Sequence, residues 1–154
     1  MTSPARAQDG FTLLETVCVV AIIAMLVAVL VPLVPRKTSR PRLEAYAIET
    51  ATLLNRDRTA AIRRRTLVST RVDPDTRSIR SGASDRVVQL PDDVAIDAVL
   101  PRRCHDAPAF HVISFFATGM SCGGSIALSR LGAGYEIRVN WLTGGIEIVP
   151  RQIL

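Results

Sequence analysis

The sequence contains few of the residues that bind metals or perform catalysis, with only three cysteines and two histidines among 154 residues. Cys104, His105, His111 and Cys122 could supply zinc ligands. They lack the paired C-x-x-C or H-x-x-x-H spacing that brings ligands together on tight turns or on one helical face. We therefore expect no metal site and no cofactor.

Histidine is also absent after His111, and this absence excludes one catalytic pattern. The segment GMSCG, residues 119–123, matches the G-x-S-x-G sequence of a nucleophile elbow. An elbow lies between a strand and a helix, and its triad needs an acid and a histidine later in the chain. The segment SIALS, which predicts a strand, follows instead. We interpret residues 119–123 as a glycine-rich loop and expect no enzyme activity.

The sequence contains only one long hydrophobic run. Residues 16–34 include no formal charge over nineteen positions, which as a helix span about 28 Å, close to the hydrocarbon thickness of a bilayer. A cleaved secretory signal would be shorter and would end in a small-x-small site, whereas PRKTSRPR follows here. The pattern predicts one transmembrane helix and one domain of about 120 residues.

The net charge of +5 and the isoelectric point near 9.9 permit contact with anionic lipid or nucleic acid, although a basic surface often serves solubility alone. Apolar residues at three-or-four spacing, including Leu43, Ala47, Ala51 and Leu54, predict an amphipathic helix from about residue 41 to 65. Residues 63–65 are all arginine, which suits a solvated last turn because cations are favourable at a helix C-terminus.

After residue 66 the pattern changes to short runs rich in valine, isoleucine and aromatic residues, separated by turn signals such as DPDT and TGG. In one run Tyr135, Ile137, Val139 and Trp141 alternate with polar residues, which predicts a half-buried antiparallel strand. The expected fold class is α+β, with one long helix followed by strands in two small sheets. The predicted strands are Leu67–Val72, Val87–Leu90, Val94–Leu100, Val112–Phe116, Ser125–Ser129, Tyr135–Trp141 and Ile146–Val149.

Glu15 places a carboxylate where the apolar run begins, a position that is costly unless the charge gains a partner. The sequence GFTLLE, residues 10–15, followed at once by the apolar run, resembles the class III signal of type IV pilins and type II secretion pseudopilins. The resemblance implies that prepilin peptidase cuts between Gly10 and Phe11 and that Phe11 is N-methylated. It also implies that Glu15, then the fifth residue, pairs with the N-terminal amine of a neighbouring subunit during assembly.

Pro32, the twenty-second residue after this cut, matches a proline that bends the helix in the family, and proline disrupts a helix on steric grounds anyway. The resemblance implies a type IV pilin-like fold, in which a long N-terminal helix, first transmembrane and then amphipathic, packs on an antiparallel β domain. The predicted segments are a cleaved leader, an assembly helix, its amphipathic continuation and the β domain, at residues 1–10, 11–34, 35–66 and 67–154.

The C-terminal region, FATGMSCGGSIALSRLGAGYEIRVNWLTGGIEI, resembles minor pseudopilins of the general secretion pathway protein H type. It also resembles FimT-like minor pilins, some of which bind DNA through C-terminal arginines. Here Gly145 and Glu147 stand where arginines would be needed, with only Arg151 nearby, and a carboxylate disfavours phosphate contact. We therefore predict a secretion pseudopilin, and a DNA-binding pilus subunit remains the alternative.

The resemblance further implies an inner-membrane protein whose C-terminal domain lies in the periplasm. The positive-inside rule alone would instead hold the basic residues 36–42 in the cytoplasm. The implied partners are prepilin peptidase, other pseudopilins, membrane lipid and secreted cargo, and DNA is not expected. An oxidising periplasm favours a disulfide between Cys104 and Cys122, with free thiols as the alternative, whereas Cys18 lies inside the predicted span.

Overall fold

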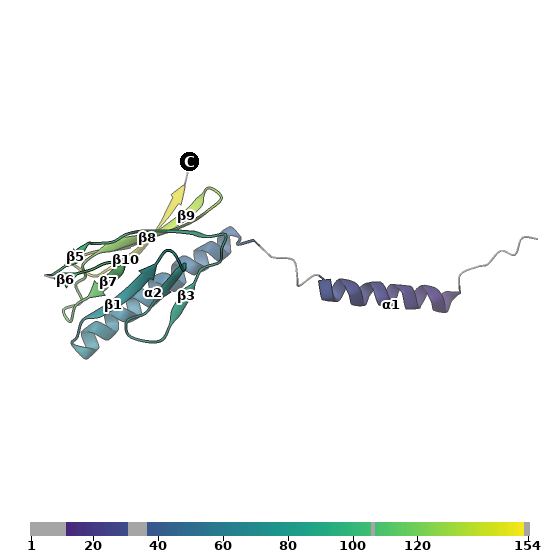
Figure 1. Ribbon diagram of the computed structural model, residues 1–154, viewed down its shortest axis with the longest axis horizontal. Helices are drawn as coiled ribbons and strands as arrows, with labels where there is room; N and C mark the ends of the chain where they lie inside the picture. Colours follow the sequence, from purple (N-terminus) through teal and green to yellow (C-terminus); the bar gives the residue numbers. More distant parts are fainter. Residues whose placement is uncertain (1–11, 31–36, 106, 153–154) are drawn as a thin grey trace, which may run out of the picture. The chain divides into compact units, whose positions relative to one another are not determined.

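The computed structural model describes residues 12–30, 37–105 and 107–152, and the chain divides into two compact units, Met1–Lys37 and Thr38–Leu154 (Figure 1). The first unit contains helix α1, Leu13–Leu30. The second begins with helix α2, Arg40–Arg64, and continues through the strands. Each unit is described separately below.

Helix α2 owes its limits to residues at both ends. Pro41 lies in the first turn, where a missing backbone N–H costs nothing. At the other end Arg65 adopts the left-handed conformation, with φ of 51°, and its backbone N–H donates to the carbonyl oxygens of Ala61 and Ile62. One face of the helix is buried, and its members are Leu43, Ala47, Thr50, Leu53, Leu54, Asp57, Ala60 and Ala61.

The strands form two four-stranded antiparallel sheets and a short ribbon, which confirms the predicted α+β class. The first sheet has the order β3-β2-β1-β7 and the second the order β10-β9-β8-β4. The first sheet comprises β1 (Val68–Asp73), β2 (Ser78–Arg80), β3 (Val87–Gln89) and β7 (Val112–Phe115). The second comprises β4 (Ala95–Val99), β8 (Gly124–Arg130), β9 (Ala133–Val139) and β10 (Ile146–Gln152). The ribbon pairs β5 (Arg103–Cys104) with β6 (Ala107–Pro108).

One hydrophobic core includes residues of α2 and of both sheets. Figure 1 shows the ribbon of α2 beside the strands. Leu54 of α2, Phe115 of the first sheet and Ile137 of the second are all fully buried in it. Burying side chains of this size stabilises the fold by roughly 1.5 to 3 kcal/mol each before entropy is counted. The helix is therefore the element that holds the two sheets together.

Trp141 corrects one prediction made from alternation. Tyr135, Ile137 and Val139 are buried as expected, but β9 ends at Val139 and Trp141 is 63% exposed. The reason is a turn that begins at Asn140, whose side-chain oxygen accepts the backbone N–H groups of Leu142 and Thr143. An asparagine that bonds its own backbone two and three residues later ends the strand before Trp141 can turn inward.

Candidate functional site

The N-terminal assembly segment is described only from Thr12 onward. Gly10, Phe11 and Pro32 lie outside the described residues, so the predicted cleavage, methylation and helix kink stay predictions. Glu15 lies in the first turn of α1 and is exposed. The described parts of the candidate site are Glu15 and the folded unit that begins at Thr38.

Thr12 forms a helix cap that the sequence analysis did not consider. Its side-chain oxygen accepts the backbone N–H of Glu15 at 3.2 Å, and the Thr12 carbonyl accepts the N–H of Thr16 at 3.2 Å. The T-L-L-E spacing is that of a capping box, in which a hydroxyl three residues before a glutamate satisfies its free N–H. Glu15 also lies at the positive end of the helix dipole. The cap and the favourable charge–dipole interaction both stabilise the start of α1, and the Glu15 carboxylate remains exposed.

The apolar residues of α1 are exposed around the helix, among them Val20, Ile22 and Met25, which are 65%, 60% and 73% exposed. Cys18 is a free, exposed cysteine. Within the described ranges, no helix combines the length and apolar character needed to cross a membrane. The predicted span ends at residue 34, and its last part falls in residues 31–36, which are not described.

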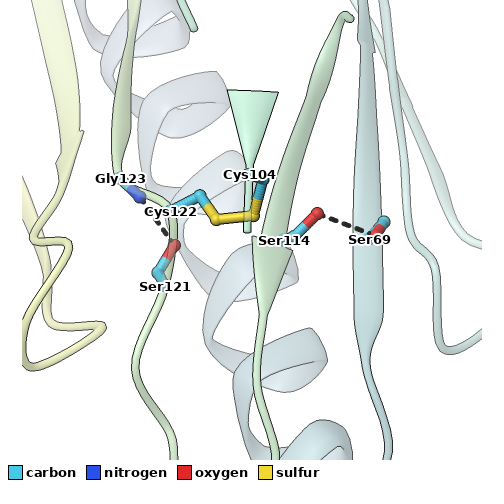
Figure 2. Close-up of a disulfide and its surroundings, with 6 residues drawn as sticks. All are labelled: Ser69, Cys104, Ser114, Ser121, Cys122 and Gly123. Carbon is cyan, nitrogen blue, oxygen red and sulfur yellow. Dashed lines mark hydrogen bonds between the residues drawn. A yellow bond between two sulfur atoms is a disulfide. The ribbon is translucent and has the colours of Figure 1, made fainter. Parts of the chain in front are cut away.

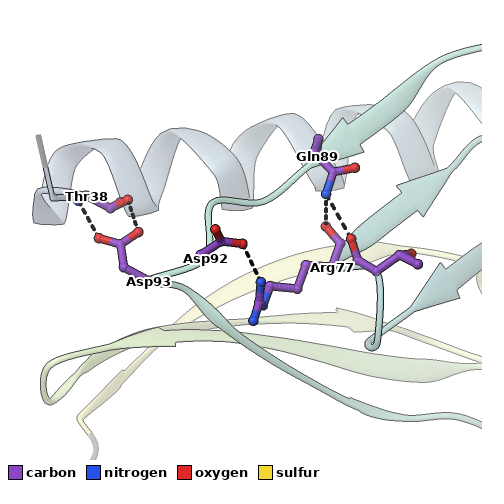
Figure 3. Close-up of polar contacts among 6 residues, drawn as sticks. Thr38, Arg77, Gln89, Asp92 and Asp93 are labelled. Carbon is purple, nitrogen blue, oxygen red and sulfur yellow. Dashed lines mark hydrogen bonds and ion pairs between the residues drawn. The ribbon is translucent and has the colours of Figure 1, made fainter. Parts of the chain in front are cut away.

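A polar clamp holds the start of the folded unit (Figure 3). The Thr38 backbone N–H donates to Asp93 Oδ2 and the Thr38 hydroxyl to Asp93 Oδ1, both at 2.7 Å. Arg130 completes the clamp, with its Nε 2.8 Å from Asp93 Oδ2 and a hydrogen bond from the guanidinium to the Thr38 carbonyl oxygen. Thr38 is only 2% exposed, so the first residue of the domain is fixed on both its donor and acceptor groups.

The clamp lowers the pKa of Asp93 below its ordinary value, chiefly through the Thr38 backbone N–H, then through the Thr38 hydroxyl and the charge of Arg130. A carboxyl whose pKa is lowered by folding stabilises the protein above its unfolded-state pKa, and this contribution is lost as the pH falls through the folded-state value. The clamp should thus weaken only in acid.

Asp93→Asn is expected to lower the thermal unfolding midpoint at pH 7, because an amide cannot accept from both Thr38 donors while pairing with Arg130. The difference in thermal unfolding midpoint between the variant and the unchanged protein should become smaller as the pH is lowered through the ordinary carboxyl range. Asp92→Asn is the matched control, since Asp92 is 98% exposed and pairs only with Arg77 (Figure 3). Scanning calorimetry at several pH values measures both, and equal midpoints for the two variants at pH 7 would contradict the clamp.

A buried carboxylate links α2 to the loop between β2 and β3. Asp57 is fully buried, and its oxygens accept from the hydroxyls of Thr70 at 2.6 Å and Ser81 at 2.5 Å. The backbone N–H groups of Gly82 and Ala83 also donate to it, at 2.9 and 3.3 Å. This site was not predicted, although an aspartate on the apolar stripe of α2 is a signal that could have revealed it.

Arg58 holds two loops at the C-terminal end of α2. Its Nε donates to the Gly119 carbonyl at 3.1 Å and its guanidinium to the Thr143 carbonyl at 3.0 Å. Gly144 is required beside them, because its φ is +61° and a Cβ there would collide with the Gly119 carbonyl oxygen. The L-T-G-G turn is thus shaped to meet the helix.

Cys104 and Cys122 form the disulfide, with Cα atoms 5.6 Å apart (Figure 2). The bond joins β5 to the segment before β8. Around it, the Cys122 N–H donates to the Ser114 carbonyl at 3.1 Å, and the Ser114 and Ser69 hydroxyls lie 2.9 Å apart. The disulfide therefore attaches the β5–β6 ribbon to the segment before β8, and that segment is hydrogen-bonded to β7 of the first sheet.

Replacing both cysteines with serine is expected to lower the free energy of unfolding by about 3 kcal/mol, the chain-entropy value for a loop of 18 residues. Denaturant titration of the oxidised protein and the double variant measures the difference. Reduction of the unchanged protein should give the same loss. Cys18→Ser is the control, because Cys18 is a free cysteine. A double variant as stable as the oxidised protein would contradict the prediction.

The G-x-S-x-G segment is a loop, as predicted. Ser121 is 4% exposed, and its hydroxyl accepts the Gly123 N–H at 3.1 Å (Figure 2). Strand β8 follows directly, in place of the helix that an elbow needs. His105 packs its ring 6.0 Å from that of Phe116. In the part of the chain that the structure describes, no group of three metal-ligating side chains comes together.

Comparison with known proteins adds three findings. The family described as the prokaryotic N-terminal methylation motif matches residues 5–31. No curated protein matches the sequence significantly. Among solved structures, the minor pseudopilin EpsH from the type 2 secretion system of Vibrio cholerae is 14% identical, with a TM-score of 0.56 over 70% of this chain and 95% of that chain.

A second solved relative is the type IV minor pilin FimU of Pseudomonas aeruginosa. In one crystal form it is 19% identical, with a TM-score of 0.55 over 73% of this chain and 92% of that chain. In another form the identity is 17% and the TM-score 0.53, over 70% and 93%. At these identities the likeness concerns the fold.

The chain therefore carries a prokaryotic N-terminal methylation motif and has a fold similar to that of type IV pilin-like proteins. Within this class it is similar to a pseudopilin of a secretion system and to a minor pilin of a pilus, and the fold does not separate the two. One of these structures is a minor pseudopilin and the other a minor pilin.

Proposed function

We propose that this chain is a minor pseudopilin of a type II secretion system, a structural subunit near the tip of a periplasmic pseudopilus that drives the export of folded proteins. The methylation motif over residues 5–31, joined to a pilin-like domain, supports a pilin-like subunit. Gly145 and Glu147, where a DNA-binding pilin would need arginines, favour the secretion system over the pilus. In this proposal the protein has no active site, and its function depends on assembly.

In the proposed pathway, prepilin peptidase removes residues 1–10 and Phe11 is methylated. Helix α1 is apolar on all sides and exposed, and such a helix is stable only in a membrane or among other helices. The inner membrane would hold it first and neighbouring subunits afterwards. Glu15 would then pair with a neighbouring N-terminal amine, since a desolvated carboxylate needs an opposite charge. The Cys104–Cys122 disulfide supports a periplasmic location of the domain.

The clamp at Thr38 fits such a subunit. Thr38 is the first residue of the folded unit, so a force applied through the N-terminal segment reaches the domain at this residue. The two bonds to Asp93 and the contact with Arg130 resist its separation from the sheets. We propose that the clamp transmits the movement of a growing pseudopilus to the β domain.

The alternative function is a minor pilin that binds DNA near its C-terminus. Charges on β9 and β10 do not favour it, because Arg138 bonds Glu136 at 2.9 Å and lies opposite Glu147 in the register. The hydrogen bond from Arg138 lowers the pKa of Glu136 below its ordinary value, so the two charges stabilise each other. This surface is balanced in charge, whereas DNA backbones bind an excess of cations.

A clean deletion of the gene in the source bacterium tests the proposal. We expect exoproteins to accumulate in the periplasm while DNA uptake and surface motility persist. The deletion strain complemented with the intact gene is the control. If secretion is unchanged and uptake or motility fails, the protein is a pilus subunit and the secretion proposal is wrong.

A further inference from the structure

A groove rich in arginine lies between α2 and the loop that joins β2 to β3. Its volume is about 620 Å³, within the range of ligand sites. We call it the arginine groove, and its lining comprises four arginines, Arg56, Arg63, Arg64 and Arg86, together with Thr52, Asn55, Thr59, Ala60, Ala83 and Ser84. The lining contains no carboxylate.

The arginines of this groove are not neutralised by the protein itself. Arg56 and Arg63 are seven positions apart on α2 and therefore lie on one face of the helix, while Arg86 comes from the loop. Among the described residues none of the four forms an ion pair, and Arg64 donates only to the Ala83 carbonyl, at 3.2 Å. Four unpaired cations around one groove favour an anionic ligand.

An apolar groove of about 510 Å³ continues from the first along α2 and β3. It shares Thr52, Arg56 and Arg86 with the arginine groove. The rest of its lining is Glu49 and the apolar residues Ala45, Ile48, Leu53, Val87 and Val88. Ile48 is 51% exposed and Val87 36% exposed, so their side chains are available to a partner. The joined surface is mainly apolar at one end, where Glu49 is the single carboxylate of the lining, and cationic at the other, where four arginines gather.

We infer that this joined groove binds an acidic, amphipathic segment of a partner protein. Carboxylates of the segment would meet Arg56, Arg63 and Arg86, and its apolar residues would cover Ile48 and Val87. Arginine suits carboxylates because its planar guanidinium can donate two parallel hydrogen bonds. Helix-in-groove or extended binding would both satisfy this arrangement.

The composition of the groove favours a protein over a nucleic acid. A phosphate backbone would use the arginine end but leave the apolar end uncovered. Single-stranded nucleic acids bind by stacking bases on aromatic side chains, and neither lining contains an aromatic residue. The inference goes beyond the proposed function and holds equally for a secretion or a pilus subunit, because it concerns the domain surface alone.

The test uses the full-length protein in a non-ionic detergent and a fluorescent 16-residue peptide with leucines in one half and glutamates in the other. Fluorescence anisotropy should show binding that weakens with salt. R56E/R86E should weaken it at least tenfold. R71E/R80E is the matched control, because Arg71 and Arg80 are exposed, pair across β1 and β2, and contribute to neither groove; it should change affinity less than twofold.

Two further measurements make the result specific. A peptide whose glutamates are replaced by lysines should bind R56E/R86E better than it binds the unchanged protein. I48S, at an exposed position, should weaken binding of the original peptide at least fivefold and leave the thermal midpoint unchanged. No binding, an equal loss in R71E/R80E, or tighter binding of a 20-nucleotide single-stranded DNA would each overturn the inference.

Discussion

Asp57→Ala is expected to lower the free energy of unfolding by about 4 kcal/mol, since it leaves two buried hydroxyl groups without their acceptor. Thr70 and Ser81 are 0% and 7% exposed, so water cannot fully replace the carboxylate. The N–H groups of Gly82 and Ala83 lose an acceptor in the same change. Denaturant unfolding followed by circular dichroism measures the loss.

Two further variants define the cause. Asp57→Asn should lie between the unchanged protein and Asp57→Ala, because the amide keeps one acceptor oxygen and places a donor against existing donors. Asn55→Ala, at an exposed position two residues away, should change the free energy of unfolding by less than about 0.5 kcal/mol. An Asp57→Ala protein within about 1 kcal/mol of the original would show that the network contributes little.

Glu15→Ala is expected to reduce incorporation into the pseudopilus by roughly tenfold or more, while cleavage of the leader proceeds. The reason is that a neighbouring N-terminal amine would lose its counter-charge in an apolar environment, which costs several kcal/mol. Incorporation is measured by crosslinking to, and copurification with, the other pseudopilins, and cleavage by the size of the protein on a gel.

Thr12→Ala separates the charge of Glu15 from the cap at the start of α1. This change removes the hydroxyl that accepts the Glu15 N–H and keeps the carboxylate. It should weaken the helix end by about 1 kcal/mol and leave assembly largely intact. Unchanged copurification of Glu15→Ala, or an equal defect in Thr12→Ala, would count against the proposed charge pairing.

The spacing of apolar residues along the chain was sufficient to predict the fold class, because helices and strands each produce a local pattern in the sequence. The stripe through Leu43, Ala47 and Leu54 lies on the buried face of α2, and the alternation through Ile137 and Val139 gives the buried face of β9. Both are properties of neighbouring residues. The Cys104–Cys122 disulfide could also be predicted from the sequence, because only these two cysteines lie in the predicted periplasmic domain.

The polar contacts could not be predicted in the same way, because they join residues far apart in the sequence. Asp93 lies 55 positions from Thr38, and Arg58 lies 85 positions from Thr143. Strand β2 was missed since its three residues, Ser78–Arg80, include only one apolar side chain. Contacts between residues that are distant in the sequence depend on the tertiary fold, and neighbouring residues give no local signal for them.

The measurement that tests the account most directly is the intact mass and N-terminal sequence of this protein, purified from membranes of cells that contain prepilin peptidase. The account predicts a chain that begins at Phe11, carries one methyl group on that residue, and lacks residues 1–10. A chain that keeps residues 1–10 in those cells, or one that is cut elsewhere, would contradict the assignment as a processed pilin-like subunit.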